Sequence, residues 1–399
     1  MHAAVVAPAA AIGENALVGT FAAGESMHGR IRLALMAMGV LALVVLVWSP
    51  LASPGDGTPN RRLFIYNWAD YIGPHTIDEF ERETGIRVIY DTYDSDETMD
   101  ARLMAGRSGY DVVSADADFY GREIRAGVYQ PLDKRRLPNW RHLDPRVLAI
   151  ESRYDPGNAH AMPYLHYVNG FAYNVDMIEK RMPNAPVNSL RMLFDPKVVS
   201  RFADCGVTFL DSPKDVIELA LRYLHLDPAS TRPQDFAAAA RLLLAVRPYV
   251  RTFDSVAYMN GLANRDLCLV MSWSSDYAVA RARAAAVGVK LNLRFTVPKE
   301  GANLDFSSLL IPVGAPDPQA AYRFLNFMLR PRVIADVTNS IYYGNDNLAS
   351  RPYVTPWILA DPALYPTPQI EQRLYLAPEV DTATERLLTR TWTLIKTGK

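Results

Sequence analysis

Short apolar runs alternate with amphipathic helical patterns along most of the chain, and this alternation limits the possible folds more than any other feature. The run at 63–66 is rich in β-branched and aromatic residues, and a helical stripe over 76–84 follows it. Gly85 then ends that helix, and strand patterns recur at 86–93 and 111–114. Strand–helix–strand order favours a parallel sheet with helices on both faces. The sequence therefore predicts an α/β fold.

The second half of the chain repeats the alternation, which indicates a second lobe. Strand patterns at 207–210 and 267–271 enclose helical patterns, and two further strands at 289–296 and 308–312 return toward the first lobe. The aromatic-rich segment 163–174 is interpreted as a pair of strands that carries the chain from one lobe to the other. A chain of 399 residues is long enough for two or three domains.

The N-terminal region has the layout of an export signal. Residues 1–26 are rich in Ala and Gly and are interpreted as an extension without a fold, followed by a signal peptide over 27–52. Its apolar run, 33–48, is short for a membrane span, which needs about 20 apolar residues. We expect the mature chain to begin close to Ser53; an uncleaved anchor is the alternative.

Composition and motifs argue against several classes of function. The net charge of −1 predicts neither a nucleic acid nor an anionic membrane as partner. The chain lacks the G-x-S-x-G, H-E-x-x-H, P-loop and G-x-G-x-x-G motifs, and its seven His show no metal-ligand spacing. We therefore expect no enzyme activity, no cofactor and no metal.

Acids and large aromatics follow three of the predicted strands. The clusters are 68–71 (Trp-Ala-Asp-Tyr), 116–120 (Asp-Ala-Asp-Phe-Tyr) and 273–277 (Trp-Ser-Ser-Asp-Tyr). Ligands of open α/β sheets bind beyond the carboxyl ends of the strands, and aromatic faces with carboxylates suit a cation. The alternative is that the aromatics are core residues and the acids belong to turns.

The chain has two cysteines, Cys205 and Cys268. An even pair in an exported protein is consistent with a disulfide, and two buried free thiols are the alternative.

From about residue 63 to the C-terminus, the sequence resembles the periplasmic polyamine-binding proteins of ABC importers, and most of all their putrescine-binding members. The segments that carry the resemblance are 66–72 (YNWADYI), 80–85 (FERETG), 103–106 (LMAG), 130–134 (QPLDK), 162–164 (MPY), 173–176 (YNVD), 324–328 (FLNFM) and 386–392 (RLLTRTW).

The resemblance implies a two-lobe periplasmic binding protein fold of type II, with the ligand held in a cleft between the lobes. Lobe 1 would comprise 62–165 plus 293–345, and lobe 2 would comprise 166–292 plus 346–399. It implies a monomeric periplasmic receptor for putrescine or spermidine that delivers its ligand to ABC permease subunits. A polyamine sensor that signals to a membrane partner is the alternative.

The resemblance also assigns residues to the site. Trp68 and Tyr71 would pack on the aliphatic stem of the ligand, and Asp70 would face an ammonium group. Trp273 would form the opposite wall beside Asp276, which would bind an ammonium group. The remaining assigned positions are Tyr343, which would close the cleft, Asp215, where the family has Glu, and the polar position Ser255. The cysteines coincide with a disulfide of the putrescine receptors.

Four positions depart from the family pattern. Ser307 takes the place of an aspartate that holds an ammonium group, and Asp305 lies where the putrescine receptors have an aromatic residue. Asp116 and Asp118 replace two serines of the cleft. Because a serine hydroxyl cannot neutralise a buried cation, we hypothesise that one of these three acids replaces the missing aspartate. The alternative is that the ligand presents no charge at this point.

Overall fold

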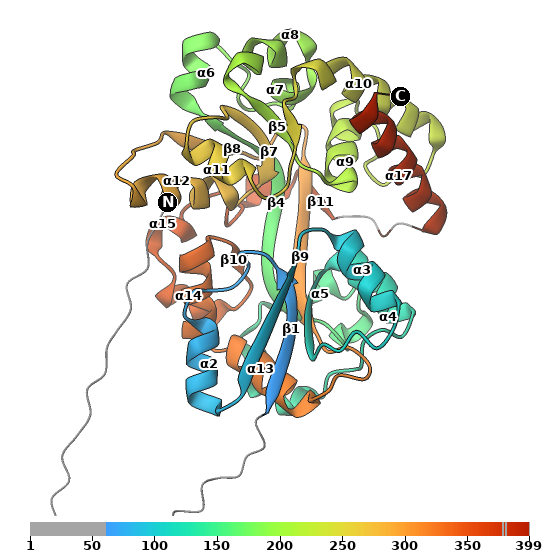
Figure 1. The fold of residues 1–399 in the computed structure, drawn as a ribbon, viewed down its shortest axis with the longest axis vertical. Helices are drawn as coiled ribbons and strands as arrows, with labels where there is room; N and C mark the ends of the chain where they lie inside the picture. The colour runs from blue at the N-terminus through green and yellow to red at the C-terminus, as the bar shows by residue number, and fades with distance from the viewer. Residues whose placement is uncertain (1–60, 377–378, 380, 399) are drawn as a thin grey trace, which may run out of the picture. The chain divides into compact units, whose positions relative to one another are not determined.

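The centre of the fold is a pair of antiparallel strands, β4 (Met162–Asn174) and β9 (Ala302–Leu310), which Figure 1 shows running between two groups of helices. The computed structural model describes residues 61–376, 379 and 381–398. The predicted extension 1–26 and signal peptide 27–52 lie outside these residues. Along the sheet the strands have the order β2-β1-β3-β9-β4-β7-β5-β6, and β10, β11 and β8 pair with β4, β9 and β4 respectively.

The other strands are β1 (Arg62–Trp68), β2 (Arg87–Tyr93), β3 (Val112–Asp116), β5 (Val207–Phe209), β6 (Thr252–Phe253), β7 (Leu269–Trp273), β8 (Leu293–Thr296), β10 (Gly344–Asn345) and β11 (Leu374–Leu376). Strands β2, β1 and β3 are parallel, as are β6, β5 and β7. The α/β fold predicted from the alternating pattern is confirmed.

Segment 162–174 is one strand, so the prediction of a strand pair was wrong. The part of β4 at 162–168 pairs with β9, and the part at 169–173 pairs with β7. Every residue of β4 is buried. Gly170 lies where the backbones of β4 and β8 approach each other closely, not in a turn. A Cβ at this position would lie 2.3 Å from the carbonyl oxygen of Thr296 on β8.

We use "lobe 1" for the elements that pack around β1, β2 and β3, and "lobe 2" for those around β5, β6, β7 and β8. Lobe 1 has two hydrophobic clusters, and lobe 2 has one large cluster centred on β5 and β7. Helices of lobe 1 are α2 (Thr76–Thr84), α3 (Asp96–Met104), α4 (Ala117–Arg125), α5 (Pro145–Glu151), α13 (Pro318–Met328) and α14 (Pro331–Ile341). The residue boundaries given above for the lobes stay a prediction.

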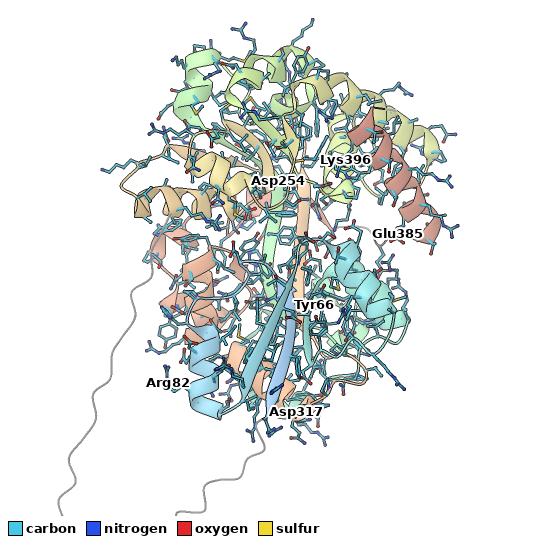
Figure 2. The ribbon with its side chains drawn as sticks, viewed as in Figure 1. Tyr66, Arg82, Asp254, Asp317, Glu385 and Lys396 are labelled. Carbon is cyan, nitrogen blue, oxygen red and sulfur yellow. A yellow bond between two sulfur atoms is a disulfide. The ribbon has the colours of Figure 1, made fainter. Side chains whose placement is uncertain are left out.

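Helices of lobe 2 are α6 (Val175–Arg181), α7 (Arg191–Phe194), α8 (Pro196–Val199), α9 (Pro213–Tyr223), α10 (Pro233–Val246), α11 (Tyr258–Ala263), α12 (Asp276–Ala286) and α17 (Thr382–Thr397); α15 (Pro356–Leu359) and α16 (Pro368–Glu371) are single turns. Figure 2 labels Glu385 and Lys396 on α17. Glu385 accepts a hydrogen bond from Arg122 of α4 at 2.9 Å, so α17 also contacts lobe 1. No helix of the described residues is both long enough and apolar enough to span a membrane.

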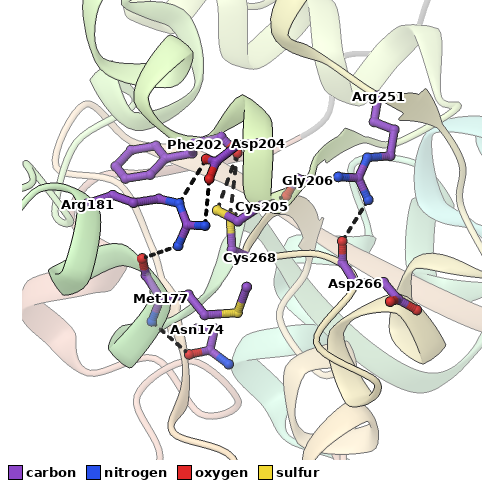
Figure 3. The surroundings of a disulfide bond; sticks show 10 residues. All are labelled: Asn174, Met177, Arg181, Phe202, Asp204, Cys205, Gly206, Arg251, Asp266 and Cys268. Atoms are coloured by element: carbon purple, nitrogen blue, oxygen red, sulfur yellow. Dashed lines mark hydrogen bonds and ion pairs between the residues drawn. A yellow bond between two sulfur atoms is a disulfide. The ribbon is translucent and has the colours of Figure 1, made fainter.

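Cys205 and Cys268 form a disulfide, as predicted (Figure 3). Cys205 ends the 3₁₀ helix η4 (Ser200–Cys205), and Cys268 directly precedes β7. The bond therefore joins a surface helix to a central strand of lobe 2.

Candidate functional site

A cavity of about 560 Å³ lies where residues of lobe 1 and lobe 2 meet. Pockets for small molecules are usually of about 300–1,000 Å³. Nine of the twelve ligand-binding positions predicted above line it: Trp68, Asp70, Tyr71, Asp116, Ser255, Trp273, Asp276, Ser307 and Tyr343. Asp118, Asp215 and Asp305 are not among the lining residues.

Two tryptophans, one from each lobe, contact each other in the wall of the cavity. Trp68 is the last residue of β1 and Trp273 the last of β7, and their ring centroids lie 6.3 Å apart. Each packs on a tyrosine: Trp68 on Tyr93 at 4.6 Å, and Trp273 on Tyr167 at 6.2 Å. Both tryptophans are half-buried, because one side packs on the protein and the other lines the cavity. Their faces can therefore pack on an alkyl chain or a cation.

Asp116, at the end of β3, is one of two buried acids that line the cavity. Its register partner on β9 is Ser307, whose hydroxyl donates to Asp116 Oδ1 at 2.5 Å. Tyr167 donates to Oδ2 at 2.8 Å, and the Tyr71 hydroxyl lies 3.0 Å from Ser307 Oγ. Burial, followed by the negative charge of Asp305, raises the pKa of Asp116 to about 8.

Asp276, the first residue of α12, is the other buried acid of the cavity wall. Tyr258 and Tyr343 both donate hydrogen bonds to its carboxylate, the latter at 3.1 Å. Burial raises its pKa to about 6, although these two hydrogen bonds oppose the shift. The Tyr343 ring also contacts Tyr71 edge-on, with centroids 4.7 Å apart. Tyr71 and Tyr343 thus form the wall between the two acids.

Neither Asp116 nor Asp276 forms an ion pair with a cation of the described residues, whereas three of the other predicted acids do. Asp70 is exposed, and its carboxylate lies 2.9 Å from Arg283 of α12. Its backbone has a positive φ of 56°, as expected in a tight turn directly after a strand. Asp70 is therefore placed at the open edge of the cavity, paired with an arginine of the other lobe.

Asp118 and Asp305 share one lysine. The Lys214 ammonium group lies 2.7 Å from Asp118 Oδ2 and 3.0 Å from Asp305 Oδ2. Lys214 belongs to α9 of lobe 2, whereas Asp118 belongs to α4 of lobe 1. Burial raises the pKa of Asp118 to about 6, although the positive charge of Lys214 acts to lower this pKa. These two acids therefore share a cation that the protein itself supplies.

The last predicted positions support the walls of the cavity. Asp215 accepts hydrogen bonds from Trp273 Nε1 at 3.1 Å and from Asn169 at 2.6 Å. It therefore holds the tryptophan wall in place from behind. Ser255 Oγ accepts a hydrogen bond from the backbone N–H of Asp211 at 3.0 Å.

Sequence reasoning missed four residues of this region: Tyr167, Tyr258, Lys214 and Arg283. Tyr167 lies on a strand that is buried along its whole length, so the sequence pattern alone could not place it. Lys214 follows Ser212 and Pro213 at the start of α9, where it looks like an ordinary helix residue.

Within the described residues, no group of three or more His, Cys, Asp or Glu side chains could hold a metal ion. The arrangement suits recognition of an organic cation.

Comparison with known proteins agrees with this geometry. Residues 75–367 match the family described as bacterial extracellular solute-binding protein. The chain is 40% identical to the putrescine-binding periplasmic protein SpuD of Pseudomonas aeruginosa, over 90% of this chain and 99% of the relative. It is 41% identical to the putrescine-binding periplasmic protein PotF of Escherichia coli, over 85% and 92%.

Among solved structures, a putative spermidine/putrescine ABC transporter protein from Listeria monocytogenes is similar, with a TM-score of 0.77 and 26% identity over 85% of this chain and all of that one. The two relatives are putrescine-binding proteins and the similar structure is that of an ABC transporter protein, and none of the three is an enzyme. The chain belongs to the family of bacterial extracellular solute-binding proteins.

Proposed function

We propose that this protein captures a short aliphatic diamine, putrescine in the first instance, in the periplasm and delivers it to an ABC permease. The observation that carries the proposal is a pair of buried carboxylates, Asp116 and Asp276, that line one cavity without a cation partner among the described residues. An unpaired buried charge is costly, so each acid favours a bound cation. Two ammonium groups joined by an alkyl chain supply both charges.

The tryptophan pair suits the middle of such a ligand. Trp68 and Trp273 would pack on the methylene groups and add a cation–π contribution near each ammonium group. Hydroxyl groups of Tyr167, Ser307, Tyr258 and Tyr343 already donate to the two acids, which keeps both carboxylates oriented in the absence of a cation.

The register of β3 and β9 explains how the site can function with Ser307 in place of the family's aspartate. Asp116 and Ser307 are directly paired residues, and their side chains are in hydrogen-bond contact. Exchanging acid and serine between the two strands therefore leaves a carboxylate at the same point of the cavity wall. Of the three candidate acids, Asp116 is the one that we propose as the replacement, because Asp118 and Asp305 are paired with Lys214.

Similarity to periplasmic relatives and the predicted signal peptide support the location. Neither Asp70 nor Asp215 is proposed as a primary ammonium ligand, since Asp70 is paired with Arg283 and Asp215 is not among the residues that line the cavity.

Isothermal calorimetry of the mature protein with putrescine, cadaverine, agmatine, spermidine and spermine tests the proposal. We expect putrescine to bind with 1:1 stoichiometry. Asp116→Asn and Asp276→Asn should each weaken its affinity about tenfold or more, because hydrogen bonds to charged groups contribute about 1.5–3 kcal/mol. Ser307→Ala is the matched control and should weaken binding less than Asp116→Asn. Absence of binding to every polyamine would contradict the proposal, as would wild-type affinity in both Asn variants.

Delivery is tested separately by polyamine uptake. Deleting the gene should abolish high-affinity uptake of the preferred diamine, and the wild-type gene should restore it. Binding in vitro with unchanged uptake would favour the sensing role instead.

A further inference from the structure

We propose that Lys214 is a built-in cation that ends the polyamine cleft and makes this receptor selective for diamines against triamines. The inference rests on the proposed function, because it concerns which polyamines that site accepts. Nothing in the sequence pattern marks this lysine, and its role follows from its contacts.

The first step is the position of Lys214 next to the cavity. Tyr167 lines the cavity and is the register partner of Asp305 on β9, and its hydroxyl bonds Asp116. Asp305 and Ser307 lie two residues apart on one strand, so their side chains share a face. The Lys214 ammonium group bonds Asp305 and is therefore just beyond the wall that Tyr167 and Ser307 form.

The second step is the charge of this region. Lys214 is 8% exposed, and Asp118 and Asp305 are more deeply buried still. Without the lysine, two buried carboxylates would remain without a cation among the described residues, beside the unpaired Asp116. The lysine ammonium thus occupies the position that an additional ammonium group of a longer polyamine would need.

The third step is the consequence for ligands. A diamine places its charges at Asp116 and Asp276 and needs no further acid. A triamine such as spermidine carries a third ammonium group, which would meet two acids that already share a buried lysine of like charge. Burying that group unpaired is unfavourable, so the cleft should discriminate against the triamine.

The test compares dissociation constants for putrescine and spermidine in the wild type and in Lys214→Ala, which removes the charge and opens space. We expect the wild type to bind putrescine about tenfold tighter than spermidine, or more. Lys214→Ala should lower the ratio of the spermidine to the putrescine dissociation constant by about tenfold or more, since each new charged hydrogen bond favours the triamine. Lys214→Arg, which keeps the charge, should retain the wild-type ratio.

Lys396→Ala is the matched control. Lys396 pairs with Asp211 at 2.7 Å on the surface of lobe 2, so its removal should leave the ratio unchanged. Adding Asp118→Asn and Asp305→Asn to Lys214→Ala should abolish the gain in spermidine binding, because the acids that would bind the third ammonium group are lost.

A second variant covers the case in which Lys214→Ala does not fold. The double variant Lys214→Met/Asp118→Asn keeps the net charge of positions 214, 118 and 305 at the wild-type value and leaves Asp305 without its lysine. It should also lower the ratio of the spermidine to the putrescine dissociation constant. A wild type that binds spermidine as tightly as putrescine would overturn the inference while leaving the proposed function intact. So would an unchanged ratio in a folded variant that lacks Lys214. Failure of the wild type to bind any polyamine would instead refute the proposed function.

Discussion

At the scale of single residues, Asp116 differs from Asp118 and Asp305 because it has no ion-pair partner among the described residues, whereas the other two share Lys214. Asp116, Asp118 and Asp305 were equal candidates because all three lie near strand ends. The structure separates them by one lysine that lies 96 residues from Asp118 along the chain. Local pattern carries no information about such a distant pair. The tryptophan walls, by contrast, were predictable, because Trp68 and Trp273 end parallel strands of the two lobes, where α/β sheets place their ligands.

The raised pKa of Asp116 predicts that putrescine binding releases a proton. Because its pKa is about 8, Asp116 is mostly protonated at pH 7 in the free protein. An ammonium group favours the ionised carboxylate and lowers this pKa, so binding expels the proton. Affinity should therefore rise with pH between about 6 and 8, by up to about tenfold per pH unit for one proton. Asp276, with a pKa of about 6, adds to this dependence only at the acidic end.

Calorimetry at pH 7 in buffers of different ionisation enthalpy measures the released protons. Asp116→Asn is the control and should bind without proton release in this range. Proton release that persists in Asp116→Asn would assign the titrating group elsewhere.

At the scale of elements, most boundaries followed from local chemistry. The helix predicted over 76–84 is α2 to the residue, because Gly85 adopts the left-handed conformation that ends it, with φ 69°. Ser212 caps α9 by accepting a hydrogen bond from the backbone N–H of Asp215, and Pro213 follows it in the first turn. The crossover was predicted less well. A fully buried strand has no alternation of polar and apolar residues, so the sequence could not show that 162–174 is one strand paired first with β9 and then with β7.

The disulfide between η4 and β7 gives a prediction about the stability of lobe 2. The cysteines are 63 residues apart, and closing a loop of this length stabilises the fold by about 4 kcal/mol in the chain-entropy model. The double variant Cys205→Ala/Cys268→Ala should lower the free energy of unfolding by about that amount in urea denaturation. Reduced wild type should resemble the variant. Neither cysteine lines the cavity, so putrescine affinity should stay close to that of the oxidised protein. Equal stability of the oxidised protein and the variant would contradict the prediction.

At the scale of the whole molecule, charge pairs join the two lobes at several points. Lys214–Asp118 is buried, whereas Arg283–Asp70 and Arg122–Glu385 are more exposed. Exposed pairs typically contribute only about 0.2–1 kcal/mol, so these two are expected to add little to the stability of the contact between the lobes. Arg283 differs from the others because it lines the cavity of the proposed site. We therefore expect its charge to affect how a cationic ligand arrives.

Arg283→Gln should speed the association of putrescine. The arginine repels an incoming dication and also neutralises Asp70, whose carboxylate is exposed at the edge of the cavity. Charges at the rim of a binding site act mainly on the association rate, and salt screens them with a Debye length of about 10 Å at 0.1 M. The association rate constant of Arg283→Gln should therefore exceed that of the wild type several-fold at low ionic strength, and the difference should fade as salt is added. Asp70→Asn should have the opposite effect.

Stopped-flow tryptophan fluorescence, with Trp68 and Trp273 as reporters in the cavity wall, measures both rates. A change confined to the dissociation rate, insensitive to salt, would show that Arg283 holds the lobes together rather than setting the field at the entrance.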